Sequence, residues 1–308
     1  MTHLAFQGRI MIEPNPVAHL RVLKPLPFVY AFYDGRIPAV RLHSHEENWL
    51  DDGGFSLGTA SYALVDEDDA LVYDTHLSLA HARKIRLFLE RMGAKRIRVV
   101  LSHHHLDHVA GNEAFADCEI IAHELTLAHL KADRAGIEDA SRHGPPAISP
   151  LVLPTRTYAG QLRLDVGRLA VDLHHANIHS DDATLLHIGE LSLLFAGDTL
   201  EDTVTYVSEP KALDTHLAEL DRLWSWSIAR ILPNHGDPTV ISDGGYEKTL
   251  IRATQQYVRM LKRCIGEPEL REQKLASLIA GPLQAKWINY FAPYEDVHRN
   301  NVRKVIAA

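Results

Sequence analysis

The sequence predicts a layered, mixed α/β (α+β) fold, and three observations support it. Short apolar runs of strand length recur along the chain, joined by tight polar turns. One or two stretches of helical spacing separate every few of these runs. After Gly245 the pattern becomes helical, with breaks near Gly266-Glu267-Pro268 and Gly281-Pro282. This order favours packed layers of sheet and helix over a strict βαβ repeat.

The first half of the chain starts with a proline-rich stretch that reads as irregular and then alternates strands with a helix. Strands are expected at residues 59–65, 70–75 and 97–101, and a helix at residues 78–92. The acidic turn at residues 66–69 joins the first two strands, and Gly93 stands where the cap of the helix belongs. A cluster of histidines follows the third strand directly.

The second half repeats this style. Strands are expected at residues 169–174, 183–187, 191–196 and 229–232, and a helix at residues 213–226. Gly189-Glu190 reads as a two-residue hairpin turn. The region from Lys131 to Gly160 is rich in proline and is expected to be irregular. Long loops inside compact domains are usually functional, so substrate specificity is expected to depend on this one.

Composition limits the classes of function. The chain has 308 residues, of which 46% are hydrophobic, enough for one large core. A formal charge of −8 disfavours a nucleic-acid partner. Cys118 and Cys264 stand far apart and suggest neither a disulfide framework nor a thiolate site. The first thirty residues form no secretory signal, and no window reaches the length of a membrane span. We therefore expect a cytoplasmic enzyme with a small-molecule substrate and no membrane partner. The sequence does not determine the oligomeric state.

Twenty histidines are the unusual feature of the composition, and several stand at short fixed spacing. In the segment His103-His104-His105-Leu106-Asp107-His108, the side chains of His103 and His105 can aim at one point. Asp107 and His108 can turn to a second point nearby. Imidazole and carboxylate groups are the ligands that zinc takes in catalytic sites. The spacing therefore predicts two ligands for each of two adjacent metal ions, against the alternative of a chance cluster in a histidine-rich chain.

The segment Ser102-His103-His104-His105-Leu106-Asp107-His108-Val109-Ala110-Gly111 resembles the metal-binding signature of the metallo-β-lactamase superfamily. Further resemblances follow in family order between about residues 59 and 240: Val72-Tyr73-Asp74-Thr75, Ile178-His179-Ser180-Asp181-Asp182, Phe195-Ala196-Gly197-Asp198 and Pro233-Asn234-His235-Gly236. The resemblance implies a four-layered αββα sandwich. We assign it to residues 1–245, with the helices of residues 246–308 packed on the same domain.

Carried over by position, the resemblance implies two divalent metal ions, with zinc favoured and iron or manganese tolerated by such ligands. The implied ligands are His103, His105 and His179 for the first ion, Asp107, His108 and His235 for the second, and Asp198 as a bridge between them. Asp74 would support this loop from outside. A hydroxide between the ions would attack a carbonyl, with Asp107 and Asp198 as the catalytic carboxylates.

The implied activity is hydrolysis of a small ester, lactone or amide. The two-zinc β-lactamases place a cysteine where this chain has Asp198, which favours lactonase-like and glyoxalase II-like enzymes. Asp182 favours the β-lactamases instead, because its position three residues after His179 resembles a pattern common among them. The alternatives are a glyoxalase II-like thioesterase, an iron-dependent persulfide dioxygenase and a non-catalytic metal-binding protein. The oxygen reductases of the superfamily usually carry a glutamate where this chain has His105, so oxygen reduction is only a minor alternative.

Other histidines are interpreted as ordinary residues. His104 is expected to point away from its neighbours, and strand alternation is expected to bury one of His174 and His175. His43 and His45 form a pair without an Asp-His partner, so at most they line the cleft.

Aromatic residues give weaker signals. Tyr206, shortly after Asp198, could donate a hydrogen bond to an oxyanion, although an ordinary strand or loop tyrosine is the simpler interpretation. Trp224 and Trp226 lie on different faces of the expected helix, so at most one can reach the cleft.

Overall fold

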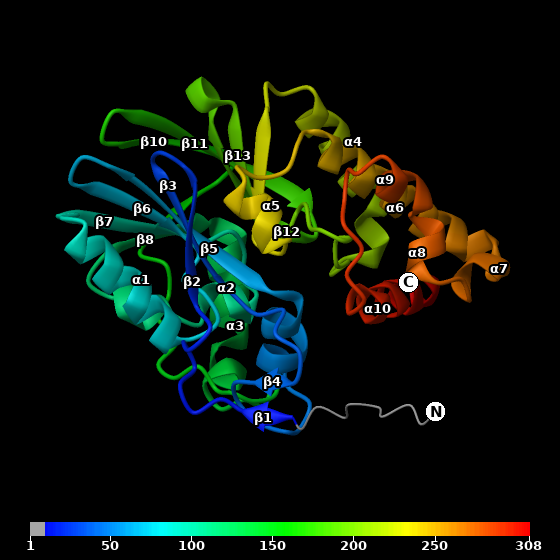
Figure 1. The fold of residues 1–308 in the computed structure, drawn as a ribbon, viewed down its shortest axis with the longest axis horizontal. Coiled ribbons are helices and arrows are strands. Elements are labelled where there is room, and N and C mark those ends of the chain that lie inside the picture. The colour runs from blue at the N-terminus through cyan, green and yellow to red at the C-terminus, as the bar shows by residue number, and fades with distance from the viewer. Residues whose placement is uncertain (1–9) are drawn as a thin grey trace, which may run out of the picture.

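Two β-sheets pack face to face in the computed structural model, which describes residues 10–308 (Figure 1). The larger sheet has the order β2 (Arg21–Leu26), β3 (Val29–Asp34), β5 (Thr59–Asp66), β6 (Asp69–Tyr73), β7 (Arg96–Val100), β8 (Glu119–His123) and β9 (Arg156–Tyr158). The smaller sheet has the order β10 (Gln161–Val166), β11 (Leu169–Ile178), β12 (Ser180–Ile188), β13 (Leu193–Gly197) and β14 (Arg230–Pro233). A separate parallel pair joins β1 (Met11–Ile12) to β4 (Val40–Arg41).

Alternation along β5 explains how one strand serves two layers. Tyr62 and Leu64 belong to the core between the sheets, whereas Ala63 and Val65 belong to the core beneath the helices. The Tyr62 ring packs edge-on against Phe195 of the smaller sheet, with 5.3 Å between the ring centroids. Its hydroxyl donates to the Pro233 carbonyl at 2.5 Å. The inner core thus fixes the ends of β13 and β14 against the larger sheet.

Helices cover the outer faces of both sheets, so the layers run αββα (Figure 1). On the larger sheet lie α1 (Leu79–Arg91), α2 (Leu106–Val109) and α3 (Glu124–Glu138). On the smaller sheet α4 (Leu213–Trp224) packs against β11, and α6 (Thr249–Gly266) packs against α4. Ser78 caps α1 by accepting from the main-chain N–H of His81, and Gly93, at φ +91°, follows its end.

The chain ends in α7 (Pro268–Arg271), α8 (Leu275–Leu278), α9 (Ala280–Gln284) and α10 (Tyr294–Ala307). The last of these packs against α6, and the short helix α5 (Pro238–Ser242) follows β14. Among residues 10–308, no helix combines the length and the apolar character needed to span a bilayer.

Three details of the sequence analysis are wrong. The stretch before residue 59 is not irregular throughout, because it contains β2 and β3 of the larger sheet. The region from Lys131 to Gly160 is helical up to Glu138, where α3 ends, and contains β9. The hairpin between β12 and β13 is longer than two residues, since Ile188 pairs with Leu193 and Ser192 adopts a left-handed conformation at φ 48°.

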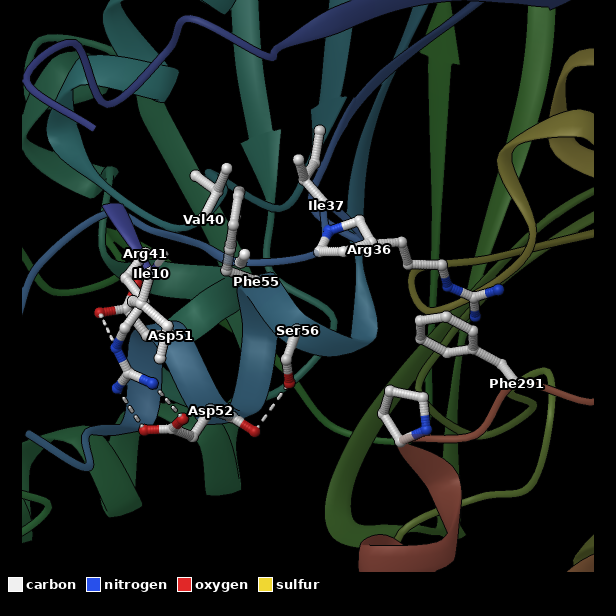
Figure 2. Close-up of a pocket in the computed structure, with 13 residues that line it drawn as sticks. Ile10, Arg36, Ile37, Val40, Arg41, Asp51, Asp52, Phe55, Ser56 and Phe291 are labelled. Atoms are coloured by element: carbon white, nitrogen blue, oxygen red, sulfur yellow. Dashed lines mark hydrogen bonds and ion pairs between the residues drawn. The ribbon is translucent and has the colours of Figure 1, made fainter. Parts of the chain in front are cut away.

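A pocket lies between the segment of residues 36–56 and the turn before α10 (Figure 2). Its lining is largely apolar and includes Ile37, Val40, Phe55, Phe291 and Pro293. The Arg36 guanidinium stacks over the Phe291 ring at 4.3 Å from the centroid. An adjoining pocket includes His45 in its lining. None of the seven expected metal ligands lines either pocket.

Candidate metal centre

The expected ligands meet at one end of the sandwich, where several strands finish. His103 follows β7, Asp198 follows β13, and His235 follows β14. Each of these strands runs parallel to a neighbour, β6 with β7 and β13 with β14, so their carboxyl ends lie together. His179 occupies the sharp turn between β11 and β12, at φ 71°. Segments far apart in sequence therefore deliver their side chains to one point.

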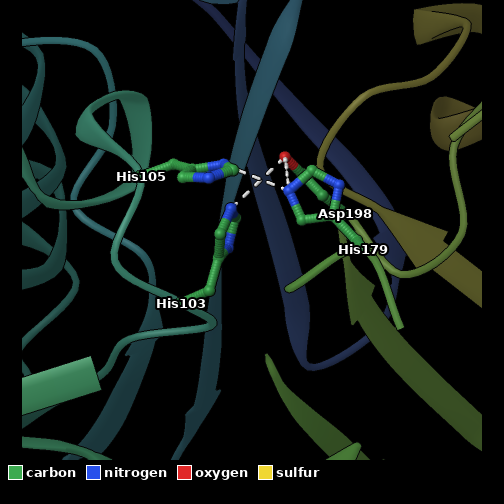
Figure 3. A group of neighbouring side chains, drawn as sticks. All are labelled: His103, His105, His179 and Asp198. Atoms are coloured by element: carbon green, nitrogen blue, oxygen red, sulfur yellow. Dashed lines mark hydrogen bonds and ion pairs between the residues drawn. The ribbon is translucent and has the colours of Figure 1, made fainter. Parts of the chain in front are cut away.

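A first ligand group consists of His103, His105, His179 and Asp198, whose ligand atoms all lie within 4.8 Å of one another (Figure 3). His179 Nε2 is 3.1 Å from His105 Nδ1. His103 Nε2 lies 3.6 Å from Asp198 Oδ2, and His179 Nε2 lies 3.8 Å from the same oxygen. Three imidazoles and one carboxylate thus face a common centre.

A second ligand group consists of Asp107, His108 and His235, again with ligand atoms within 4.8 Å of one another. His235 Nε2 is 3.2 Å from Asp107 Oδ2, and His108 Nε2 is 3.5 Å from Asp107 Oδ1. Asp198 belongs here too, because its Oδ2 lies 3.1 Å from His108 Nε2 and 3.3 Å from His235 Nε2. One carboxylate oxygen therefore stands between the two groups.

Hydrogen bonds on the outer side of each imidazole set which ring nitrogen faces the centre. The Nδ1 atoms of four histidines lie near oxygens of the surrounding chain: His103 near Ser102 Oγ at 2.9 Å, His108 near Asp74 Oδ2 at 2.9 Å, His179 near Tyr206 O at 3.0 Å, and His235 near Gly58 O at 2.8 Å. A ring N–H that donates to such an oxygen leaves Nε2 free for a metal. His105 is reversed, with Nε2 3.4 Å from Ser208 Oγ and Nδ1 facing inward.

Burial and mutual contacts shift the pKa values of the buried ligands. Burial and the neighbouring imidazoles of His108 and His105 lower the pKa of His103 well below its usual value. Burial alone would raise the pKa of Asp198, yet His108 and His235 hold it well below its usual range. His103 Nε2 and Asp198 Oδ1 are buried and have no hydrogen-bond partner within residues 10–308. Burial alone would lower the pKa of His108 and His235, yet Asp198 and Asp107 raise it well above its usual value, so a cation would displace a proton from these two rings. The unpartnered donor atoms of His103 and Asp198 fit a divalent metal site.

Residues 55–251 match the family model of the metallo-beta-lactamase superfamily. The chain belongs to this superfamily. The seven ligand positions all fall within the matched range. A comparison with curated proteins finds no match.

Solved metallo-beta-lactamase structures share the fold at low identity. VMB-1 at pH 5.5 gives a TM-score of 0.57 at 13% identity, over 78% of this chain and 97% of that chain. DIM-1 exposed to ceftazidime gives 0.55 at 18% identity, over 76% and 97%. The enzyme from Pontibacter korlensis gives 0.54 at 15% identity, over 76% and 99%. At such identities the likeness shows the shared fold.

The remaining histidines of the sequence analysis lie outside both ligand groups. His104 turns to Asp182, with 3.1 Å between Nδ1 and Oδ1. His43 and His45 are exposed. The prediction that one of His174 and His175 is buried is wrong, because both are half-buried. His174 packs on Trp226 at 4.4 Å between ring centroids, and His175 stacks on His123 at 4.0 Å.

Tyr206 contributes through its main chain as well as its ring. Its carbonyl accepts from His179, and its ring centroid lies 5.9 Å from that of His179. The Tyr206 hydroxyl accepts from Lys304 Nζ at 2.5 Å. Trp224, the last residue of α4, contacts Arg252 of α6 and Lys248 just before that helix.

Several residues that support the site gave no clear signal in the sequence. Ser208 and Gly58 act through single contacts to ligating histidines. Asn234 is the exception, because it belongs to the segment Pro233-Asn234-His235-Gly236 that resembles the superfamily. Its Nδ2 donates to Asp74 Oδ2 at 2.6 Å.

The C-terminal helix braces the loop that carries Tyr206. Asn301 on α10 is fully buried and forms a two-way clamp on that loop. Its Nδ2 donates to the Thr205 carbonyl at 2.9 Å, and its Oδ1 accepts from the Val207 N–H at 2.9 Å. Tyr206, the acceptor for His179, lies between the two clamped residues. A helix outside the matched range therefore helps to position a ligand of the first group.

We expect Asn301→Leu to destabilise the fold by about 1–3 kcal/mol, because two buried backbone groups lose their partners. Zinc affinity should fall as well, since His179 loses its fixed acceptor. Urea unfolding and zinc titration measure the two effects. Asn300→Leu is the control, because Asn300 is the neighbouring residue on α10 and is only half-buried. Equal zinc affinity in the two variants would count against the bracing role.

A glycine of the π-helical turn Leu50–Phe55 makes room for Asp107. A Cβ on Gly54 would lie 2.5 Å from Leu77 Cδ2 and 2.9 Å from Asp107 Cβ. We expect Gly54→Ala to cost about 1–3 kcal/mol of stability through overpacking. A displaced Asp107 should also lower turnover by at least about 10-fold. Denaturant unfolding and steady-state kinetics measure these effects. The neighbouring Gly53→Ala is the control, since its Cβ meets nothing within 4 Å, and it should change neither quantity.

Proposed function

We propose that this protein is a dinuclear metal-dependent hydrolase that attacks the carbonyl of a small ester, lactone or amide. The observation that carries the proposal is the position of Asp198 Oδ2, within 3.1–3.8 Å of a nitrogen on four histidines drawn from both ligand groups. A carboxylate in that place can bridge two cations.

Divalent ions held by the two groups would supply Lewis-acid polarisation of the carbonyl and lower the pKa of water toward neutrality. The residues of the chain do the rest. Asp198 holds the two ligand groups together, and its side chain is 4% exposed. The Asp107 side chain is 16% exposed, so it faces the solvent side of the centre. Asp107 can accept a proton from the attacking water at a carboxylate oxygen and deliver it to the leaving group.

The second ligand group favours this function over one-iron sulfur oxidation. A mononuclear dioxygenase needs a single set of ligands, whereas Asp107, His108 and His235 form a complete additional set. Their outer contacts are also in place, with Asp74 behind His108 and the Gly58 carbonyl behind His235. A thioesterase of the glyoxalase II kind uses the same centre, and only substrate comparison separates it from an esterase or lactonase.

The test combines metal analysis with a substrate panel. Elemental mass spectrometry of the purified protein should give at least two zinc ions per chain. Esters, lactones, amides and thioesters are then offered to the metal-free protein and to the same sample after zinc is restored. Hydrolysis that returns only with zinc supports the proposal, and the preferred member of the panel names the bond. A single iron with oxygen consumption, or no hydrolysis of any acyl substrate, would overturn it.

A further inference from the structure

A third group of metal-ligating side chains lies on the rim of the centre. His104, His129 and Asp182 each present a ligand atom within 4.8 Å of the others. They come from three separate elements, namely the loop of the histidine motif, α3 and β12. None of the three belongs to the two ligand groups already described. His104 is the middle residue of the His103-His104-His105 run, so the loop that carries first-group ligands also contributes to this cluster.

The contacts within the cluster leave acceptor capacity unused. His104 Nδ1 lies 3.1 Å from Asp182 Oδ1, and the rings of His104 and His129 lie 4.5 Å apart between centroids. His129 Nε2 lies 2.7 Å from Asp181 Oδ1, which brings a second carboxylate to the cluster. The Asp182 side chain is fully buried, yet its Oδ2 has no hydrogen-bond partner within residues 10–308. An unpaired carboxylate oxygen in a buried place is costly, and a bound cation would satisfy it.

We propose that His104, His129 and Asp182 form a third divalent-cation site, separate from the dinuclear centre. Two imidazoles and a carboxylate are a zinc-type ligand set, since magnesium and calcium prefer oxygen ligands throughout. Asp181 or water can complete a tetrahedral shell. The His104 and His129 side chains are 23% and 37% exposed, so a cation can enter from solvent.

A cation in this site would fasten α3 to the loop of the histidine motif. His129 lies in the middle of α3, the helix that leads into the proline-rich loop, and Asp182 lies at the start of β12. His104 lies between His103 and His105, so a cation held by the cluster would connect α3 and β12 to the loop of the first ligand group. None of these three residues belongs to the dinuclear centre, so the third site does not depend on which substrate that centre takes.

The test counts zinc ions at equilibrium. Metal-free protein is dialysed against micromolar zinc, and bound zinc per chain is measured by elemental mass spectrometry. If both this site and the dinuclear centre fill, the wild type binds about three ions, and His129→Ala binds about two. His187→Ala is the matched control. His187 is another histidine, and it lies on the same strand as Asp182. It stands five residues beyond Asp182, or about 17 Å away at roughly 3.4 Å per residue.

The outcome is decided by the difference between the two variants. Loss of one zinc ion in His129→Ala, with none lost in His187→Ala, supports the third site. Equal zinc content and equal zinc affinity in the wild type and His129→Ala would overturn it. His129 is partly exposed on a helix, so the alanine variant should fold, and matching circular dichroism and thermal unfolding of the metal-free proteins check this. The dinuclear centre is judged separately, by the ions that remain in His129→Ala.

Discussion

Replacing Asp198 by asparagine is expected to reduce zinc binding at the two ligand groups to about one ion or fewer and to lower hydrolysis by at least about 100-fold, because even residues that only support metal ligands cost 10–100-fold when mutated. Asn keeps the size of the side chain but removes its negative charge. That charge faces nitrogens of His103, His108, His179 and His235 at 3.1–3.8 Å. Without this charge, no anion between the two ligand groups offsets the repulsion between two cations.

The measurement pairs zinc content by elemental mass spectrometry with the rate on the best substrate of the panel. Asp172→Asn is the matched control, since Asp172 is a half-buried carboxylate on β11 that pairs with Arg163 at 3.6 Å and contacts no ligand. An Asp198→Asn variant that still binds two zinc ions in the His129→Ala background, which lacks the proposed third site, would remove the basis for the bridging role. Retained metal with lost activity would instead restrict Asp198 to a catalytic task.

The local part of the site could be predicted from the sequence. The residues from His103 to His108 occupy one continuous segment, so their spacing alone constrains where four ligands point. Helix α2 begins at Leu106, just after His105, and turns Asp107 and His108 toward the second group. By contrast, spacing could not place His179, Asp198 and His235, because their meeting depends on how two sheets pack. The resemblance to a known superfamily supplied those three.

The failure to predict β2 has a physical explanation. β2 is an edge strand of the larger sheet, where a proline is tolerated because one side of the strand has no ladder partner. Pro25 within it made the segment look irregular. The start of the expected loop at Lys131 was wrong for a related reason. Gly136 lowers helix propensity in the last turn of α3, yet tertiary packing of Leu130 and Ile137 keeps that turn helical.

Contacts from distant parts of the chain were beyond the reach of periodicity. Gly58 precedes β5 and holds His235 through a carbonyl, and Asn301 acts from the last helix. Neither residue type marks a metal site. Their roles arise only once the N-terminal segment and α10 pack beside the strand ends. That the proline-rich loop determines specificity stays a prediction, because the two pockets described above lie elsewhere and contain no expected metal ligand.

Asp74 is the buried residue that joins the two halves of the centre from behind. It follows β6 and is fully buried. Its Oδ1 accepts from the main-chain N–H of Ser102 at 2.6 Å. Its Oδ2 lies 2.9 Å from His108 Nδ1 and accepts from Asn234 Nδ2 at 2.6 Å. One carboxylate thus orients a ligand, the loop beside His103 and the residue beside His235.

We expect Asp74→Asn to weaken zinc binding by about 10–100-fold, as other changes behind metal-ligating histidines do. The amide oxygen of the introduced asparagine can still accept one hydrogen bond, but its NH₂ group would face donors on His108 or Asn234. Asn suits the backbone here, because Asp74 has φ 66° and asparagine tolerates that left-handed conformation better than alanine. Asp74→Ala should be worse, at a cost of about 3–5 kcal/mol in unfolding free energy, because it leaves buried polar groups without a partner.

Zinc affinity from competition with a chelating dye, and stability from urea unfolding of the metal-free protein, separate these effects. Asp34→Asn is the matched control. Asp34 is equally buried at the end of β3, accepts from the Gly35 N–H at 2.7 Å and lies 3.0 Å from His81 Nε2. It contacts none of the seven ligands, so its variant should lose stability and keep zinc affinity. If Asp74→Asn and Asp34→Asn lose stability alike and both keep wild-type zinc affinity, Asp74 only supports the fold, and its hydrogen bond to His108 does not position that ligand for metal.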